Sequence, residues 1–376
     1  MRAVGLFSGI GGFELGLAKA GIVTDLSCEN WDPAVRILQR RFQSELVGDI
    51  RELRSLPNCD VLTAGFPCTD LSQVGRTAGI DGSESGLIRE VFRLIAGNPP
   101  KWVVLENVPN MLSLHGGAPI RHITEWFERR KWNWAYRTVD SQYFGVRQRR
   151  RRTFLVASRS HDPRTVLFAD DRSPRPDVRS HRAHGFSWTE GNRGIGWGDG
   201  VTPTLKGGSK LCIASPPGVW LLDHEAGTAI VRPTVVAGER LQGFASDWTA
   251  GAGPEGVRWK LVGNAVTVPV AKWIGSRLLE PGTPVDVPRR GLAEVQRWPS
   301  AAAGVGDERE AWSLSERPLS IQSRLSLSTT LAQYGDQPLS LGATKGFVAR
   351  LKASSLKSRP GFIQALDEHI CVLEKS

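Results

Sequence analysis

The sequence predicts an α/β fold: a parallel sheet covered by helices on both faces, joined to a smaller loop-rich domain. In the first third of the chain, apolar stretches that suit strands alternate with stretches of helical period. The strand-like stretches are continuously apolar, as expected of strands buried on both faces. From about Asp170 a Gly-, Arg-, Asp- and Trp-rich stretch shows little periodicity, and its aromatic residues indicate a small ordered module.

Cap and turn signals place individual elements in the first third of the chain. Gly21 ends a helical stretch and suits a left-handed cap, while Asp32 and Pro33 suit an N-cap and the position after it. The expected strands cover residues 3–7, 23–30, 60–67 and 101–108, and the expected helices cover residues 13–20, 32–42 and 84–97.

The remainder of the chain divides by composition and apolar pattern. A regular apolar pattern returns at residues 234–280, and a Pro- and Gly-rich linker begins after Glu280. Low-complexity sequence then runs to about residue 340, before two expected helices at 344–356 and 360–374. We therefore expect four consecutive parts, which cover residues 1–168, 169–233, 234–280 and 281–376.

The composition excludes several classes of protein. The five cysteines include no CxxC pair, which argues against a disulfide framework and a structural zinc site and fits a reducing cytoplasm. The chain shows no signal-peptide pattern and no apolar run of membrane-spanning length, so we expect a soluble cytoplasmic protein. A formal net charge of +10, with five arginines within residues 147–152, favours a polyanionic partner.

A glycine-rich turn directly follows the first expected strand. Its pattern, Phe7-x-Gly9-x-Gly11-Gly12, leaves backbone N–H groups at a helix N-terminus for a bound ligand. Glu14 stands where the dinucleotide fingerprint has its third glycine. This acid disfavours a pyrophosphate and favours a ligand with a cationic part.

Two acids at strand ends extend this interpretation. Glu29 ends the second expected strand, where an acid typically accepts hydrogen bonds from a ribose diol. Asp49 follows the next helix and is placed to accept from an adenine amino group. An adenosine with a positive centre and no phosphate is S-adenosylmethionine. The glycines alone would also suit a tight turn, so the interpretation depends on the acids.

Two further strand ends carry reactive side chains. Free cysteines are usually inert core residues, but Cys68 follows a proline and precedes polar residues. That places it at the carboxyl end of a strand, where open α/β sheets bind their ligands. Glu106 and Asn107 end another apolar strand, and a carboxyl group there is costly unless it has a task. By itself, Glu106 would also suit a structural hydrogen bond.

Six motifs, FSGIGG, GFPC, ENV, QRRRR, RLQGF and GNAV, occur in one order. With them, residues 2–280 resemble the DNA (cytosine-5)-methyltransferases of bacteria and phages. The resemblance implies a Rossmann-like, S-adenosylmethionine-dependent methyltransferase fold with a mixed sheet. Two positions depart from the family pattern: Thr69 replaces a Gln, and Arg147 replaces a Pro. These departures bear on substrate contacts rather than on the covalent chemistry.

The resemblance also implies a reaction on a cytosine flipped out of the duplex. Cys68 would add to C6 and make C5 nucleophilic, while Glu106 would protonate or hydrogen-bond N3. Arg150 and Arg152 would hold the base O2 and favour the thiolate. The expected DNA-binding residues are Phe66, Pro67, Ser72, Asn107 and Gln148. The expected cofactor-binding residues are Phe7, Gly9, Gly11, Gly12, Glu29, Asp49, Ile50, Asn264 and Val266; no metal is expected.

The four parts of the chain take their roles from the same resemblance. Residues 1–168 would form the catalytic and cofactor-binding domain, and residues 169–233 the target-recognition domain. Residues 234–280 would return to complete the catalytic domain, and residues 281–376 would form a linker and a C-terminal helical extension. Glu239, Arg240 and Gln242 are expected to be architectural.

The expected partners are double-stranded DNA and a cognate restriction endonuclease that acts on the same site, and we expect a monomer. Two alternatives stay open: an RNA cytosine-5 methyltransferase, and a catalytically silent sequence-specific DNA-binding protein. A nicotinamide oxidoreductase is disfavoured by Glu14 and the missing third glycine.

Overall fold

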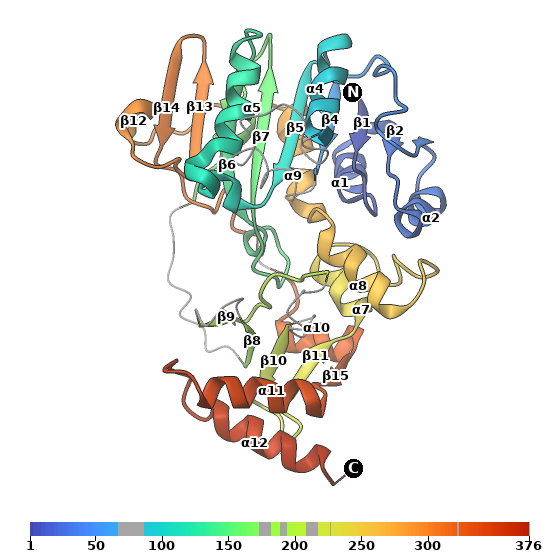
Figure 1. Ribbon diagram of the computed structural model, residues 1–376, viewed down its shortest axis with the longest axis vertical. Helices are drawn as coiled ribbons and strands as arrows, with labels where there is room; N and C mark the ends of the chain where they lie inside the picture. The colour runs from blue at the N-terminus through green and yellow to red at the C-terminus, as the bar shows by residue number, and fades with distance from the viewer. Residues whose placement is uncertain are drawn as a thin grey trace. The chain divides into compact units, whose positions relative to one another are not determined.

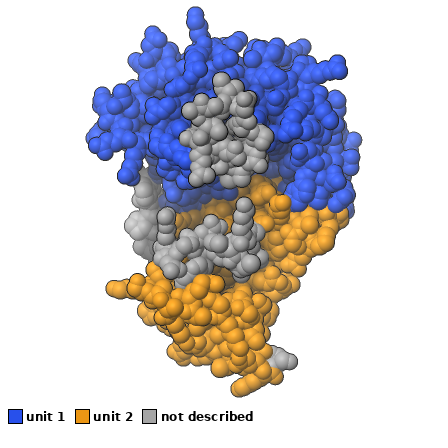
Figure 2. All heavy atoms as spheres, in the orientation of Figure 1, with its two compact units in different colours: residues 1–144, 151–175, 266–320 blue, residues 145–150, 176–265, 321–376 orange. Residues whose placement is uncertain are grey.

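The computed structural model describes residues 1–66, 86–172, 182–188, 194–207, 217–225, 227–321 and 323–375. The chain forms two compact units (Figure 2). The first unit contains residues 1–144, 151–175 and 266–320, and the second contains residues 145–150, 176–265 and 321–376. Each unit is therefore assembled from three separate stretches of sequence.

A large mixed sheet forms the centre of the first unit (Figure 1). Among the described strands its order is β12-β14-β13-β6-β7-β5-β4-β1-β2-β3. Neighbours from β3 to β5 are parallel, whereas β7, β6, β13, β14 and β12 each pair antiparallel with their neighbours. The strands are β1 (Arg2–Leu6), β2 (Val23–Cys28), β3 (Glu45–Val47), β4 (Val61–Ala64), β5 (Trp102–Asn107), β6 (Asn133–Asp140), β7 (Arg151–Ser158), β12 (Arg289–Gly291), β13 (Ala301–Val305) and β14 (Glu308–Trp312).

Helices cover both faces of this sheet, which confirms the predicted fold class. Successive strand residues point to opposite faces. Val103 and Leu105 pack with α4 and α5 in one core, while Trp102 and Val104 pack with α1, α6 and α9 in another. The helices of this unit are α1 (Gly12–Ala20), α2 (Asp32–Arg41), α4 (Gly86–Gly97), α5 (Ala118–Glu128), α6 (Arg164–Leu167) and α9 (Val268–Leu279), with short 3₁₀ turns η1 (Pro109–Leu112), η2 (Leu114–Gly117), η3 (Ser141–Tyr143) and η4 (Leu292–Glu294).

Of the two predicted helix caps, the C-cap of α1 is confirmed and the N-cap of α2 is not. Gly21 adopts the expected left-handed conformation after α1, with φ 97°. The prediction of Asp32 as N-cap of α2 is wrong, because Trp31 holds the extended cap position and Asp32 is already helical. Asp32 therefore acts in the first turn, where its charge favours the helix dipole.

Part of the linker and low-complexity stretch predicted after Glu280 forms regular structure. Residues 281–288 contain no helix or strand, but residues 289–312 supply β12, β13 and β14, which extend the large sheet beyond β6. The expected parts differ from the observed units for this reason, and also because residues 321–376 belong to the second unit. Short strands of Ala, Gly and Arg carry little apolar pattern, so the sequence offered no signal for them.

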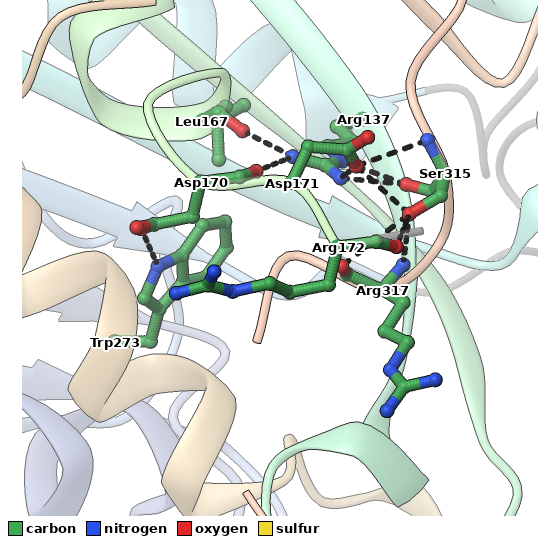
Figure 3. Close-up of polar contacts among 8 residues, drawn as sticks. All are labelled: Arg137, Leu167, Asp170, Asp171, Arg172, Trp273, Ser315 and Arg317. Carbon is green, nitrogen blue, oxygen red and sulfur yellow. Dashed lines mark hydrogen bonds and ion pairs between the residues drawn. The ribbon is translucent and has the colours of Figure 1, made fainter. Parts of the chain in front are cut away.

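The buried guanidinium of Arg137 fastens the added strands to the rest of the first unit (Figure 3). Arg137 lies on β6 and donates to the carbonyl oxygens of Leu167 and Asp170 at 3.0 and 2.5 Å. It also donates to the Ser315 carbonyl and forms an ion pair with Asp171. Asp171 in turn accepts from the backbone and hydroxyl of Ser315.

The second unit contains a smaller antiparallel sheet, whose described strands follow the order β15-β11-β10-β8-β9. Phe186 on β8 and Ile230 on β11 share an apolar core with α11 and α12, so the C-terminal helices are part of this unit. Its strands are β8 (Ala183–Trp188), β9 (Ile195–Asp199), β10 (Gly218–Leu221), β11 (Ile230–Pro233) and β15 (Asp336–Pro338), and its helices are α7 (Val235–Leu241), α8 (Glu255–Asn264), α10 (Leu327–Tyr334), α11 (Leu341–Lys352) and α12 (Phe362–Leu373).

In the part of the chain that the structure describes, every helix is too short or too polar to cross a membrane.

Candidate active site

The glycine-rich turn between β1 and α1 is a tightly held loop. Phe7 has φ 56°, a left-handed conformation that is costly for a non-glycine residue and often marks a functional site. A Cβ on Gly12 would overlap the carbonyl oxygen of Val266, so only glycine allows this close approach. The segment that returns to the first unit at Val266 therefore packs directly on the loop.

Glu29 connects this loop to the end of β2. Its Oε2 accepts the Gly9 N–H at 2.8 Å, and its Oε1 accepts the Trp31 N–H at 2.9 Å. An ionised carboxylate has about four lone-pair sites, so these two bonds leave capacity for a ligand hydroxyl. The carboxylate is thus fixed in place at the strand end where the sequence predicted a ribose contact.

Asp49 and Ile50 lie in a turn after β3. Asp49 accepts the Arg51 N–H at 2.9 Å, and Ile50 is buried. Arg93 on α4 donates to the carbonyl oxygens of Ile50, Leu53 and Arg54 at 3.3, 2.8 and 3.1 Å. Arg93 was not predicted, because a side chain that binds backbone carbonyls leaves no pattern in the sequence.

The ends of β4 and β5 and the start of β7 bring a second group of predicted residues together. Glu106 Oε1 lies 3.0 Å from Arg152 Nε in a largely buried ion pair. A Cβ on Gly65 would lie 3.5 Å from Glu106 Oε2 and 3.7 Å from Val266 Cγ2. The glycine before Phe66 therefore faces the carboxylate of the neighbouring strand.

Asn107 holds the chain at the same strand end. Its Nδ2 donates to the Phe66 carbonyl at 3.0 Å, and its Oδ1 accepts the Val108 N–H at 2.8 Å. Phe66 is the last residue described before the expected nucleophile. The predicted site residues Pro67, Cys68 and Ser72, and the departure at Thr69, lie outside the described residues.

Comparison with known proteins identifies the family. Type II methyltransferase M2.BsuMI of Bacillus subtilis is 42% identical to this chain over 98% of the chain and 97% of its own length. The model of the C-5 cytosine-specific DNA methylases matches residues 1–184. The chain belongs to the C-5 cytosine-specific DNA methylase family. It is a DNA (cytosine-5) methyltransferase.

More distant relatives of this methyltransferase match in part. M.HhaI of Haemophilus parahaemolyticus is 29% identical over 43% of the chain and 50% of its own length. Among solved structures, the Dnmt2 methyltransferase of S. pombe aligns with a TM-score of 0.57 at 17% identity, over 74% of this chain and 98% of that chain. The latter likeness concerns the fold alone.

The arginine-rich motif of the methyltransferase divides between the two units. Buried and exposed residues alternate along the motif: Gln148 and Arg150 are buried, and Arg149 and Arg151 are exposed. Arg150 is 1% exposed and donates to the carbonyl oxygens of Leu205 and Ala265 at 3.2 and 2.9 Å, all within the second unit.

Gln148, expected to contact DNA, is fully buried. Its Nε2 donates to the Leu241 carbonyl at 3.1 Å, and its Oε1 accepts the Leu205 N–H at 2.9 Å. The structure therefore places Gln148 in the interior of the second unit and pairs Arg152 of this motif with Glu106. Asn264 is the last residue of α8, is exposed and belongs to the second unit. Val266 belongs to the first unit.

Two other cysteines of the methyltransferase suit no nucleophilic role. Burial, reinforced by nearby carboxylates, raises the pKa of Cys28 to about 12 and that of Cys59 to about 11. Such thiols stay protonated at neutral pH and are poor nucleophiles. Within the described ranges, no group of three or more His, Cys, Asp or Glu side chains is arranged to hold a metal ion.

Proposed function

We propose that the enzyme methylates C5 of cytosine in one specific double-stranded DNA sequence, with S-adenosylmethionine as donor, as the modification enzyme of a type II restriction–modification system. The observation that carries the proposal is the convergence of Glu106, Arg152 and Asn107 around the strand end that leads into Cys68. The type II name of the Bacillus subtilis relative supports the biological context.

The residues of the glycine loop fit the proposed cofactor. Glu29 keeps lone pairs for a ribose diol, and a Cβ added to Gly9 would meet no described atom within 4 Å, so the loop is open there. Asp49 and Ile50, at the turn that Arg93 holds, would receive the adenine. When bound, S-adenosylmethionine supplies an electrophilic methyl group on a sulfonium centre.

The protein side chains would prepare the cytosine for attack. The Cys68 thiolate adds to C6, and Glu106 protonates or hydrogen-bonds N3, so that electron density moves to C5. Arg152 orients Glu106 and stabilises negative charge on the base. After C5 has gained the methyl group, loss of its proton and departure of Cys68 restore the aromatic ring.

Arg150 takes a different role in this proposal. Its guanidinium donates to two backbone carbonyls inside the second unit, and through these bonds it positions the segment that leads to Arg152. The reacting base must leave the duplex to reach Cys68. We assign sequence recognition to residues 169–233, whose described strands belong to the small sheet, and we expect a monomer with duplex DNA and a cognate endonuclease as partners.

A trapping experiment tests the proposed chemistry. Duplex DNA that contains 5-fluorocytosine at the target cannot lose a proton from C5, so the wild-type enzyme with S-adenosylmethionine should form a stable covalent adduct. Cys68→Ala should form none and should lose methyl transfer while still binding DNA. Cys371→Ala, which changes an exposed cysteine, is the matched control. Adduct formation by Cys68→Ala would refute the assignment.

Bisulfite sequencing of DNA from cells that express the enzyme would identify the target. We expect one methylated sequence rather than scattered cytosines. Methylation without sequence preference would contradict the proposed role in a restriction–modification system.

A further inference from the structure

One acid beneath the glycine loop has no task in the mechanism above. Glu14 lies in the first turn of α1 and is 2% exposed. Among the described residues, neither of its carboxyl oxygens has a partner in hydrogen-bonding geometry, and the same holds for the buried Ser8 hydroxyl. Unpartnered buried carboxyl groups are rare, because each costs free energy that a partner would recover.

The fold keeps space for this carboxyl group. A Cβ on Gly5 of β1 would overlap Glu14 Oε1 and would lie 2.8 Å from Ser8 Oγ. The absence of a side chain at Gly5 therefore makes room for the Glu14 carboxyl group between β1 and α1. Ser8 belongs to the loop that follows β1, so this carboxyl group lies close to the loop.

Among the described residues, no cation pairs with Glu14. On α9, which packs on α1, Lys272 is exposed and Arg277 binds Asp170. On the neighbouring strands, Arg2 pairs with Asp25. Burial raises the pKa of Glu14 to about 7. The Ser8 hydroxyl, which is near but outside hydrogen-bonding geometry, and the backbone of Glu14 oppose this rise, and Glu29 adds slightly to it.

We propose that Glu14 is an additional cofactor-binding residue, which supplies the negative charge that balances the sulfonium of S-adenosylmethionine. This inference rests on the proposed function. A positive centre in the loop would favour the carboxylate, as would the N-terminus of α1. Binding of the sulfonium therefore releases a proton from Glu14 to the solvent. The neutral thioether product, S-adenosylhomocysteine, lacks that charge and leaves the acid protonated.

Calorimetric titration of the purified enzyme tests this inference without turnover. S-Adenosylmethionine and S-adenosylhomocysteine differ at the sulfur centre, so the ratio of their affinities isolates the sulfonium charge. In the wild-type enzyme we expect the ratio to shift toward S-adenosylmethionine by about fivefold or more between pH 6 and pH 8. In Glu14→Gln the ratio should not change with pH.

Glu280→Gln is the matched control, since it removes an exposed carboxyl group just after α9. It should keep the wild-type dependence on pH. A wild-type ratio that stays constant from pH 6 to pH 8 would overturn the inference even if Glu14→Gln failed to fold. If neither ligand binds at any pH, the proposed cofactor is wrong, which is a separate result from a constant ratio.

Discussion

Two buried charged side chains of the first unit, Arg137 and Glu14, differ in how the protein satisfies them. Arg137 is surrounded by carbonyl oxygens and by the Asp171 carboxylate, all supplied by the chain. Glu14 is as deeply buried, yet its carboxyl oxygens have no partner among the described residues. The first arrangement is complete without a ligand, and the second is completed by one.

The contrast separates structural from functional polar groups by a physical criterion. Burial lowers the pKa of Arg137 to about 10, with Asp171 opposing the change, so the guanidinium stays charged at neutral pH. Burial raises the pKa of Glu14 to about 7, so that acid is poised between its two forms. Changes to the two side chains should therefore differ in how their effect on stability depends on pH.

The largest effect is expected at Arg137. Arg137→Met removes the donor of the Leu167, Asp170 and Ser315 carbonyl oxygens and the cation that pairs with Asp171, so the free energy of unfolding should fall by about 3–5 kcal/mol. Urea denaturation measures this loss. Arg129→Met, which removes an exposed ion pair with Glu125, is the control and should cost less than about 0.5 kcal/mol. Equal losses in the two variants would show that the Arg137 network is not structural.

A smaller effect, which depends on pH, is expected at Glu14 in the cofactor-free enzyme. Between pH 4.5 and about 7 the unfolded state releases the Glu14 proton while the folded state keeps it, so stability falls as the pH rises. The shift corresponds to about 3 kcal/mol, fully lost above pH 7. Denaturation of Glu14→Gln at pH 5 and pH 8 should show a correspondingly flatter profile, and an unchanged profile would argue against a buried acid.

The smallest effect concerns Glu29, which is only partly buried and already has internal partners. Glu29→Ala should weaken S-adenosylmethionine binding by about 1–3 kcal/mol, because the ribose loses a charged acceptor and Gly9 loses its anchor. Calorimetry at constant pH measures this change. Glu45→Ala, at an exposed position of β3, should leave the affinity as it is. If both variants bind equally well, Glu29 is not at the cofactor.

The sequence was most informative where each strand is buried on both faces. The apolar runs of β4 and β5 predicted those strands to within a few residues, and Asn107 at the end of β5 donates to the Phe66 carbonyl just beyond β4. Parallel strands direct their carboxyl ends to one edge of the sheet, so residues far apart in sequence could be placed together from pattern alone.

Other parts of the fold left no readable pattern. Residues 301–303 are three alanines, which favour strands weakly, yet β13 forms because it pairs with β6 and Gly304 packs against Trp134. The burial of Gln148 and Arg150 depends on backbone carbonyls and amides of distant segments. Such partners have no side-chain signature, which also explains why Arg93 was missed.

Because the first unit is formed from three separate stretches of sequence, its folding on the ribosome must wait for the last of them. α9, which covers Phe13 and Leu17, is translated only after most of the second unit. At typical translation rates this interval lasts on the order of ten seconds. During that time the nascent first unit lacks one of its covering helices and the strand that neighbours β6. Those apolar surfaces are natural binding sites for a chaperone, and the first unit completes its core only when residues 266–320 emerge.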